Sequence, residues 1–163
     1  MTATDTSITT PLPADTTSQA VVATLHDHDT YIKTTCPHLL SQTHVCGTPG
    51  PGPGRPCVYN ITDKRPIGQT TFKMTLTNVA QGVEAVIEGR APTGAMTVTS
   101  KWRAADGQLH EAVEIESNLV TKKLIKANIE KTHPDFHQEF FAATARDPMS
   151  STSKGEGISK IEI

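Results

Sequence analysis

The chain changes its hydrophobic period once, and that change limits the folds available to it. From Val58 to Glu116, apolar and polar residues alternate between turn residues, which is typical of antiparallel strands with one face in solvent. From Ser117 to about Ala143, apolar residues recur at helical spacing instead. A half-apolar sheet followed by one amphipathic helix is buried most economically when the sheet curves around the helix. We therefore expect an α+β fold with a ligand cavity between the two.

The composition fits one domain, residues 1–145, followed by a tail, residues 146–163. The 163 residues are 36% hydrophobic but only 4% aromatic, which predicts an adequate core with few large rings. A net charge of −2 without a basic block argues against nucleic acid as a partner. No apolar run approaches the roughly 18 residues of a membrane span, and the N-terminus lacks the pattern of a secretory signal. We expect a cytoplasmic protein with three reduced cysteines that follow no zinc spacing: Cys36, Cys46 and Cys57.

Seven strands and two short helices can be placed from the pattern. The dipeptide Asp106-Gly107 is a strong signal for a two-residue hairpin turn, and further turns are expected over Asn78–Gly82 and Ala91–Gly94. A helix through Ala20–Leu25 can be capped by Asp15, Thr16 or Thr17, and a second helix over Asp29–Thr35 ends before Pro37. Strands are expected over residues 6–11, 39–46, 58–63, 71–77, 83–88, 96–103 and 112–116.

Three segments interrupt this order. The stretch Gly47–Pro56, GTPGPGPGRP, predicts an exposed and mobile loop that either serves as a connector or covers the mouth of a pocket. Pro134 lies within the helical pattern, so we expect the helix to be kinked or split near His133. The last residues, Ile158–Ile163, alternate and are consistent with an edge strand, within this chain or in a homodimer, or with a frayed tail.

The order of strand, two short helices, six strands and a long helix resembles the helix-grip fold of START-like (Bet v 1-like, polyketide cyclase-like, SRPBCC) domains. More narrowly, several short stretches resemble a fungal family of START-like proteins, and the similarity covers about residues 6–140. These stretches are Leu25–Asp29 (LHDHD), Tyr59–Lys64 (YNITDK), Asn78–Val83 (NVAQGV), Ala91–Gly94 (APTG) and Lys101-Trp102. The resemblance implies a curved sheet of about seven strands wrapped around a long C-terminal helix, and a pocket for a hydrophobic small molecule.

The motif His26-Asp27-His28-Asp29 combines imidazoles with carboxylates, which suits metal binding or acid–base chemistry. Histidines two residues apart on one helix point about 200° apart, which disfavours a shared metal. One interpretation is a helix end, where an aspartate caps the next helix and one histidine binds the backbone. The other is a catalytic histidine at the cavity rim, for which we select His28.

Tyr59 is predicted to point inward with Ile61, where its phenol is either satisfied within the core or donates to a ligand. Trp102 follows the apolar face of its strand and either fills the core or lines a cavity. Asn128 lies beside the apolar stripe of the long helix and either meets a ligand or sits at the surface. The positions predicted to contact a substrate are Phe72, Met74, Ile87, Val98, Trp102, Ile125, Asn128 and Ile129.

No nucleophile elbow, phosphate-binding glycine loop or dinucleotide fingerprint is present in the sequence, so we expect no cofactor. The functional hypothesis is a cofactor-independent enzyme of fungal polyketide or terpenoid biosynthesis. It would bind an apolar intermediate and promote cyclisation or isomerisation, including a pericyclic [4+2] cycloaddition, with His28 and Tyr59 polarising the substrate. The alternatives are a non-catalytic carrier of a lipid or hydrophobic metabolite and a structural dimer module built on the C-terminal strand.

Overall fold

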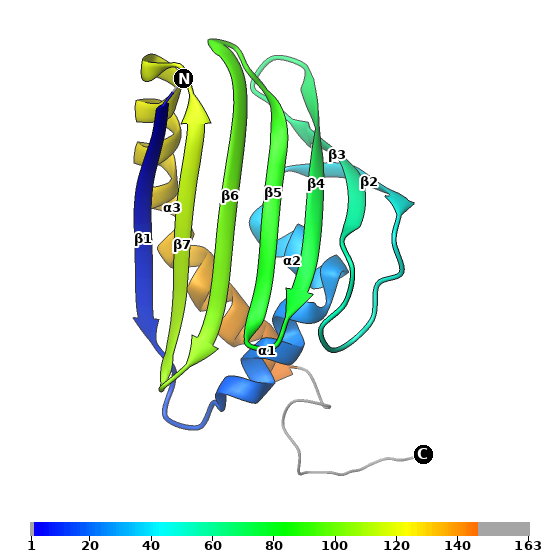
Figure 1. The fold of residues 1–163 in the computed structure, drawn as a ribbon, viewed down its shortest axis with the longest axis vertical. Coiled ribbons are helices and arrows are strands. Elements are labelled where there is room, and N and C mark those ends of the chain that lie inside the picture. The colour runs from blue at the N-terminus through cyan, green and yellow to red at the C-terminus, as the bar shows by residue number, and fades with distance from the viewer. Residues whose placement is uncertain (1, 147–163) are drawn as a thin grey trace.

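Residues 2–146, which the computed structural model describes, form one curved antiparallel sheet with three helices on the same face (Figure 1). The strand order is β1-β7-β6-β5-β4-β3-β2, so β1 returns to pair with the last strand of the chain while all later strands pair in sequence. The strands are β1 (Thr2–Pro11), β2 (Leu39–Cys46), β3 (Cys57–Lys64), β4 (Gln69–Val79), β5 (Gly82–Ala91), β6 (Gly94–Ala105) and β7 (Gln108–Ser117).

The predicted strands are confirmed, and most extend by a few residues. The first strand begins at Thr2 rather than Thr6, because it pairs with the full length of β7, up to Ser117. Asp106 and Gly107 form the predicted hairpin turn with φ values of 54° and 74°, as that turn type requires. The turn expected over Asn78–Gly82 is shorter than predicted.

Asn78 belongs to β4 rather than to the turn. The sheet register aligns it with Val83, Trp102 and Glu111 across the neighbouring strands. Because this row contains the fully buried Trp102, its members face the helices. Asn78 is therefore a buried polar group on the concave face, and it needs hydrogen-bond partners.

Two short helices follow β1 and meet at Asp27. Helix α1 spans Ser18–His26 and begins at Thr17, whose hydroxyl accepts a hydrogen bond from the Ala20 N–H. Helix α2 spans His28–Thr35, and the Asp27 carboxylate accepts a hydrogen bond from the Thr30 N–H at its start. Asp27 has an extended backbone, φ −81° and ψ 98°, so it ends one helix and caps the next.

The long helix α3 spans Leu119–Arg146 and crosses the concave face diagonally, in contact with β1, β7, α1 and α2 (Figure 1). The helix is not split at Pro134, because α3 is one helix through this residue; the alternative of a kink near His133 stays a prediction. Proline in a helix interior costs about 3 kcal/mol, since it removes a backbone hydrogen bond and crowds the preceding turn. Contacts on both sides offset that cost: His133 and His137 both bind the sheet residue Glu111, described below.

The core between the sheet and the helices consists of two apolar clusters. The larger contains Phe72, Met74 and Trp102, and the smaller contains Val98 and Ile129, with Ile87 and Ile125 packed against it. These are the inward positions predicted from the alternation, whereas Asn128 is exposed. The predicted ligand cavity between sheet and helix stays a prediction. The predicted edge strand, Ile158–Ile163, lies outside the described residues.

Candidate functional site

A pocket of about 560 Å³ opens where the junction of α1 and α2 faces β2, β3 and the glycine- and proline-rich loop. Its wall combines polar groups, three of them imidazoles, with the apolar surfaces of alanine and proline. The lining residues are Ala23, His26, Asp27, His28, Asp29, Gln42, His44, Pro49, Gly50, Pro51 and Tyr59.

His28 and Tyr59, the two predicted catalytic residues, meet at this pocket. The His28 Nδ1 atom lies 2.8 Å from the Tyr59 hydroxyl oxygen, and the rings meet edge to face. Both side chains are buried, and they come from the start of α2 and the middle of β3. His44 on β2 is the cross-strand partner of Tyr59, and the centroids of their two rings are 5.4 Å apart.

Asn78 fixes the proton on the His28 ring. Its amide nitrogen donates to the Gly50 carbonyl at 2.9 Å, which leaves its oxygen facing His28 Nε2, also at 2.9 Å. The Nε2 atom must therefore carry the hydrogen, and Nδ1 is left to accept one from the Tyr59 hydroxyl. As a result, a Tyr59 oxygen lone pair remains available for a ligand that donates a hydrogen bond.

His26 ties the loop to the sheet in a similar way. Its Nε2 atom lies 2.9 Å from the carbonyl oxygens of both Val79 and Gly82, so this nitrogen is the donor. The opposite nitrogen then accepts a hydrogen bond from the Gly52 N–H at 3.1 Å. Together with the bond from Asn78 to Gly50, this contact fixes the loop as one wall of the pocket.

The helix-end interpretation of the His-Asp-His-Asp motif therefore applies to His26 and Asp27, whereas a catalytic role for His28 stays a prediction. His26 binds backbone carbonyls at a helix end, and Asp27 caps the next helix, whereas His28 faces the pocket. The motif is not one continuous helix, because the chain is extended at Asp27. Among the described residues, no group of three or more His, Cys, Asp or Glu side chains has an arrangement that suits a metal ion.

The environment keeps His28 and Tyr59 in their neutral forms. Burial lowers the pKa of His28, although the hydrogen bond with Asn78 partly opposes this effect. Burial, followed by the nearby Cys57 thiol, raises the pKa of Tyr59 to about 12. A neutral imidazole that accepts a proton from a neutral phenol is an arrangement for relaying protons at neutral pH.

The eight positions predicted to contact a substrate do not line this pocket. Met74 is the nearest by topology, since it is the cross-strand partner of Tyr59 and packs in the core beneath it. Trp102 is fully buried, and its indole N–H donates to the Tyr31 hydroxyl at 2.9 Å. The structure thus brings the polar pair together and places the apolar set behind it.

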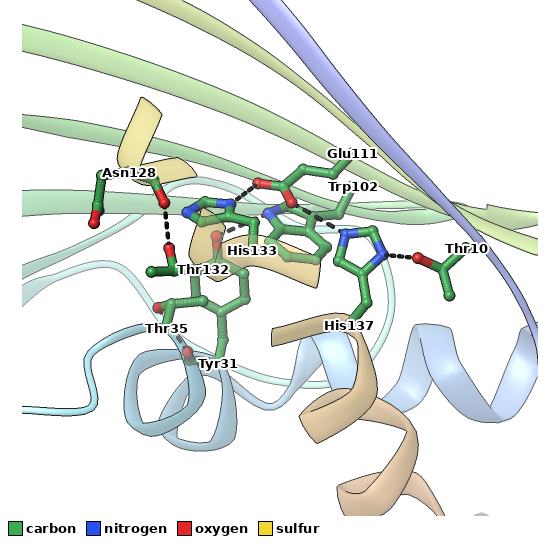
Figure 2. Close-up of polar contacts among 9 residues, drawn as sticks. All are labelled: Thr10, Tyr31, Thr35, Trp102, Glu111, Asn128, Thr132, His133 and His137. Carbon is green, nitrogen blue, oxygen red and sulfur yellow. Dashed lines mark hydrogen bonds and ion pairs between the residues drawn. The ribbon is translucent and has the colours of Figure 1, made fainter. Parts of the chain in front are cut away.

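A second polar cluster, which the sequence pattern does not predict, lies on the concave face between β7 and α3 (Figure 2). Glu111 has no exposed surface, and its carboxylate oxygens lie 2.6 Å from His133 Nδ1 and 3.1 Å from His137 Nε2. Two signals were available. Glu111 occupies an inward position of its strand, between Leu109 and Val113, and the two histidines are four residues apart in the helical pattern.

With this geometry established, comparisons with known proteins place the chain. The sequence model of a family described as a domain of unknown function, DUF7053, matches residues 1–146. The chain belongs to the DUF7053 family. No protein in the curated set matches it significantly. None of the helices in residues 2–146 of this DUF7053 domain has the length and apolar character needed to cross a membrane.

Solved structures share the fold of the DUF7053 domain at low sequence identity. Ara h 8.0201 matches with a TM-score of 0.60 and 14% identity, over 90% of this chain and 100% of its own. The ZhuI aromatase/cyclase from Streptomyces sp. R1128 matches with a TM-score of 0.57 and 13% identity, over 89% of this chain and 94% of its own. The di-domain aromatase/cyclase StfQ of the steffimycin pathway matches with a TM-score of 0.56 and 8% identity, over 87% of this chain and 50% of its own. The DUF7053 domain thus has the Bet v 1-like helix-grip fold, as the sequence predicts.

Proposed function

We propose that this DUF7053 protein is a cofactor-independent cyclase or isomerase acting on a small molecule with several carbonyl groups. The observation that carries the proposal is the hydrogen-bonded His28–Tyr59 pair at the wall of the pocket, held in one tautomer by Asn78. Solved relatives of the fold that are titled aromatase/cyclases support the choice of reaction class. The pathway to which such a step would belong, fungal polyketide or terpenoid biosynthesis, is the expectation from the sequence resemblance.

The His28–Tyr59 pair can take a proton from the substrate and return it, so that the protonation of both residues is the same before and after the reaction. The Tyr59 oxygen takes an acidic hydrogen from a carbon or hydroxyl beside a substrate carbonyl while the Tyr59 proton moves to His28 Nδ1. The resulting enolate carbon attacks a second carbonyl of the same molecule, which forms one carbon–carbon bond and an alkoxide. The proton returns from His28 through Tyr59 to the alkoxide, so substrate and product are isomers.

The pocket also restricts the shape of a flexible substrate. The volume of about 560 Å³ is within the usual range for small-molecule sites. Ala23, Pro49 and Pro51 provide apolar walls beside the polar pair. Orientation alone lowers reaction barriers by roughly 7–11 kcal/mol in favourable cases, which is the contribution that a pericyclic ring closure would use.

Turnover of a synthetic linear triketo ester, followed by mass spectrometry, tests the proposal. We expect Tyr59→Phe and His28→Gln each to lower the rate of ring closure by about 10²-fold or more. The matched control is His38→Gln, an exposed histidine outside the pocket, which should leave the rate unchanged. Native mass spectrometry after exposure to a metabolite extract then identifies the compound that the pocket retains.

The same measurements separate the alternatives. A carrier binds one equivalent and leaves the products and their rate of formation unaltered, which would overturn the proposed enzyme. Catalysis by shape alone survives both Tyr59→Phe and His28→Gln but is lost when Ala23→Trp fills the pocket. That outcome would replace the proton relay with a pericyclic or purely conformational mechanism.

A further inference from the structure

The buried cluster on the concave face differs from the pocket in carrying a carboxylate. Glu111 extends from β7 toward α3 and is completely enclosed. Burial alone would raise the pKa of its carboxyl group, but hydrogen bonds from His133 and His137 outweigh that effect and lower it. Glu111 is therefore ionised at neutral pH, and its two oxygens accept one hydrogen bond each from the two imidazoles.

Both ring nitrogens of His137 form hydrogen bonds within the protein. Its Nε2 atom donates to Glu111 at 3.1 Å, and its Nδ1 atom lies 2.9 Å from the hydroxyl of Thr10, which donates to it. The side chain has no exposed surface. A proton from outside can reach neither nitrogen without breaking one of these bonds.

His133 is different, because only one of its nitrogens is used. Nδ1 donates to Glu111 at 2.6 Å, and no other described residue forms a hydrogen bond with the ring. The side chain keeps 15% of its surface exposed. Figure 2 shows the second ring nitrogen pointing away from Glu111, on the side of Asn128 and Thr132.

The ring of His133 is also held in place by aromatic contacts. Trp102 stacks on it with an interplanar angle of 19° and a centroid distance of 6.3 Å, and Phe136 lies 4.8 Å away. Trp102 is enclosed, whereas Phe136 is partly exposed and offers an aromatic surface next to the His133 ring. An apolar aromatic molecule fits such a surface.

We propose that His133 is a general base activated by Glu111. Its Nε2 atom accepts a proton from a carbon or an oxygen of a small, acidic aromatic molecule. An ionised carboxylate on one imidazole nitrogen fixes the tautomer and stabilises the imidazolium that forms when the other nitrogen takes a proton. The charged and titratable groups that face His133 are Glu111 from β7, His137 from α3 and, through Trp102, the Tyr31 hydroxyl from α2. Glu111 supplies the negative charge among them.

This site is independent of the His28–Tyr59 pocket. Tyr31 lies on α2, three residues after His28, and stacks with Phe140 while its hydroxyl accepts from Trp102. These rings are buried and belong to the larger core cluster. His133 is also absent from the residues that line the pocket. Loss of one site therefore leaves the other intact.

The probe for this base is 5-nitrobenzisoxazole, whose isoxazole ring opens when a base removes the proton on the carbon of that ring. The proton passes to His133 Nε2, the nitrogen–oxygen bond breaks, and its electron pair remains on oxygen as a coloured nitrophenolate bearing a nitrile. Water then takes the proton from His133, so the base is regenerated. We expect the intact protein to open the probe faster than an equal concentration of free imidazole.

Variants identify the residue responsible. His133→Gln should reduce the rate at least tenfold, within the usual contribution of a general base of about 10²–10⁴. The matched control is His110→Gln, an exposed histidine whose Nδ1 atom binds Thr9 at 2.6 Å but which has no carboxylate partner. Glu111→Gln should lower the rate, because it removes the negative charge that activates His133.

Three results would overturn the inference: no acceleration over free imidazole, an undiminished rate in His133→Gln, or a rate abolished by His28→Gln. The last result would assign the reaction to the pocket of the proposed function instead. Acylation of the unmodified protein by diethyl pyrocarbonate provides a test that needs no folded variant. Peptide mapping should find His133 acylated and His137 protected, and equal reaction of both would contradict the geometry.

Discussion

Replacing Glu111 with leucine should strongly destabilise the packing of α3 on the sheet. The substitution keeps the side chain buried but removes the acceptor for two imidazole N–H groups. Those donors then face an apolar group, and the contacts that hold α3 to the sheet on both sides of Pro134 are lost. Buried donors without acceptors are costly because they have lost their water.

The expected magnitude follows from the two bonds. Hydrogen bonds to a charged group contribute about 1.5–3 kcal/mol each, so the two bonds together contribute about 3–6 kcal/mol. His133 keeps 15% of its side-chain surface exposed, so water can satisfy part of its loss. We therefore expect the free energy of unfolding to fall by about 3–4 kcal/mol, near the lower end of that range.

A compensating variant separates the loss of these hydrogen bonds from the loss of packing. Glu111→Leu combined with His133→Phe and His137→Leu removes the donors together with the acceptor and keeps similar volumes. Replacing a whole buried ionic cluster by packed apolar residues is often neutral. The triple variant should therefore recover most of the stability lost in the single variant, to within about 1–2 kcal/mol of the original protein.

Urea denaturation followed by tryptophan fluorescence measures both effects, because Trp102 is the single tryptophan and contacts both histidine rings. The folded pKa of Glu111 is below its unfolded value of about 4.3. Its stabilising contribution is therefore present above that pH and is lost as the pH falls through the folded pKa. Glu111→Leu should weaken this acid dependence. A single variant as stable as the original protein, or a triple variant as unstable as the single one, would refute the reasoning.

Three further outcomes are expected. Pro134→Ala should raise the free energy of unfolding by about 1–3 kcal/mol, because it restores a backbone donor within the continuous helix α3; a loss of stability in urea denaturation would mean that the proline fits a local bend. Thr17→Ala should cost about 1 kcal/mol by removing the cap of α1, whereas the exposed Thr9→Ala serves as its control. Burial raises the pKa of Tyr59 to about 12, and burial with the Glu111 charge raises that of Tyr31 well above 10. Phenolate absorbance should therefore appear later on alkaline titration than in the unfolded chain, and stability should fall as the pH rises through the folded values; ordinary titration near about 10 would contradict this burial.

Much of the candidate pocket could be anticipated from local patterns. Tyr59 was predicted to point inward from its strand, and His28 was selected at a helix end, and the two side chains are hydrogen-bonded. Their pairing could not be predicted, because it depends on how α2 packs against β3 across 31 residues of sequence. The role of Asn78 was hidden for the same reason, since a turn was expected at its position.

The errors have a common origin in tertiary contacts. Pro134 predicts a break when the helix is considered alone, but the binding of its neighbours to Glu111 outweighs that local preference. Glu111 itself was overlooked because one carboxylate among apolar positions looks like an irregularity of the strand pattern. Its partners are 22 and 26 residues away, on an element whose orientation no local pattern specifies.

The sequence by itself determined which positions face inward in the strands after Val58, the hairpin turn at Asp106-Gly107 and the capped start of the first helix. These features depend on side-chain periodicity and on backbone preferences within a few residues, as at Thr17 and at Asp106-Gly107. Only the tertiary structure decided which polar groups meet, which ring nitrogen of His28 carries its proton, and that His133 alone keeps a nitrogen free beside a buried carboxylate. Those outcomes depend on distances between elements far apart in the chain, and hydrogen bonding is sensitive to such distances at the scale of an ångström.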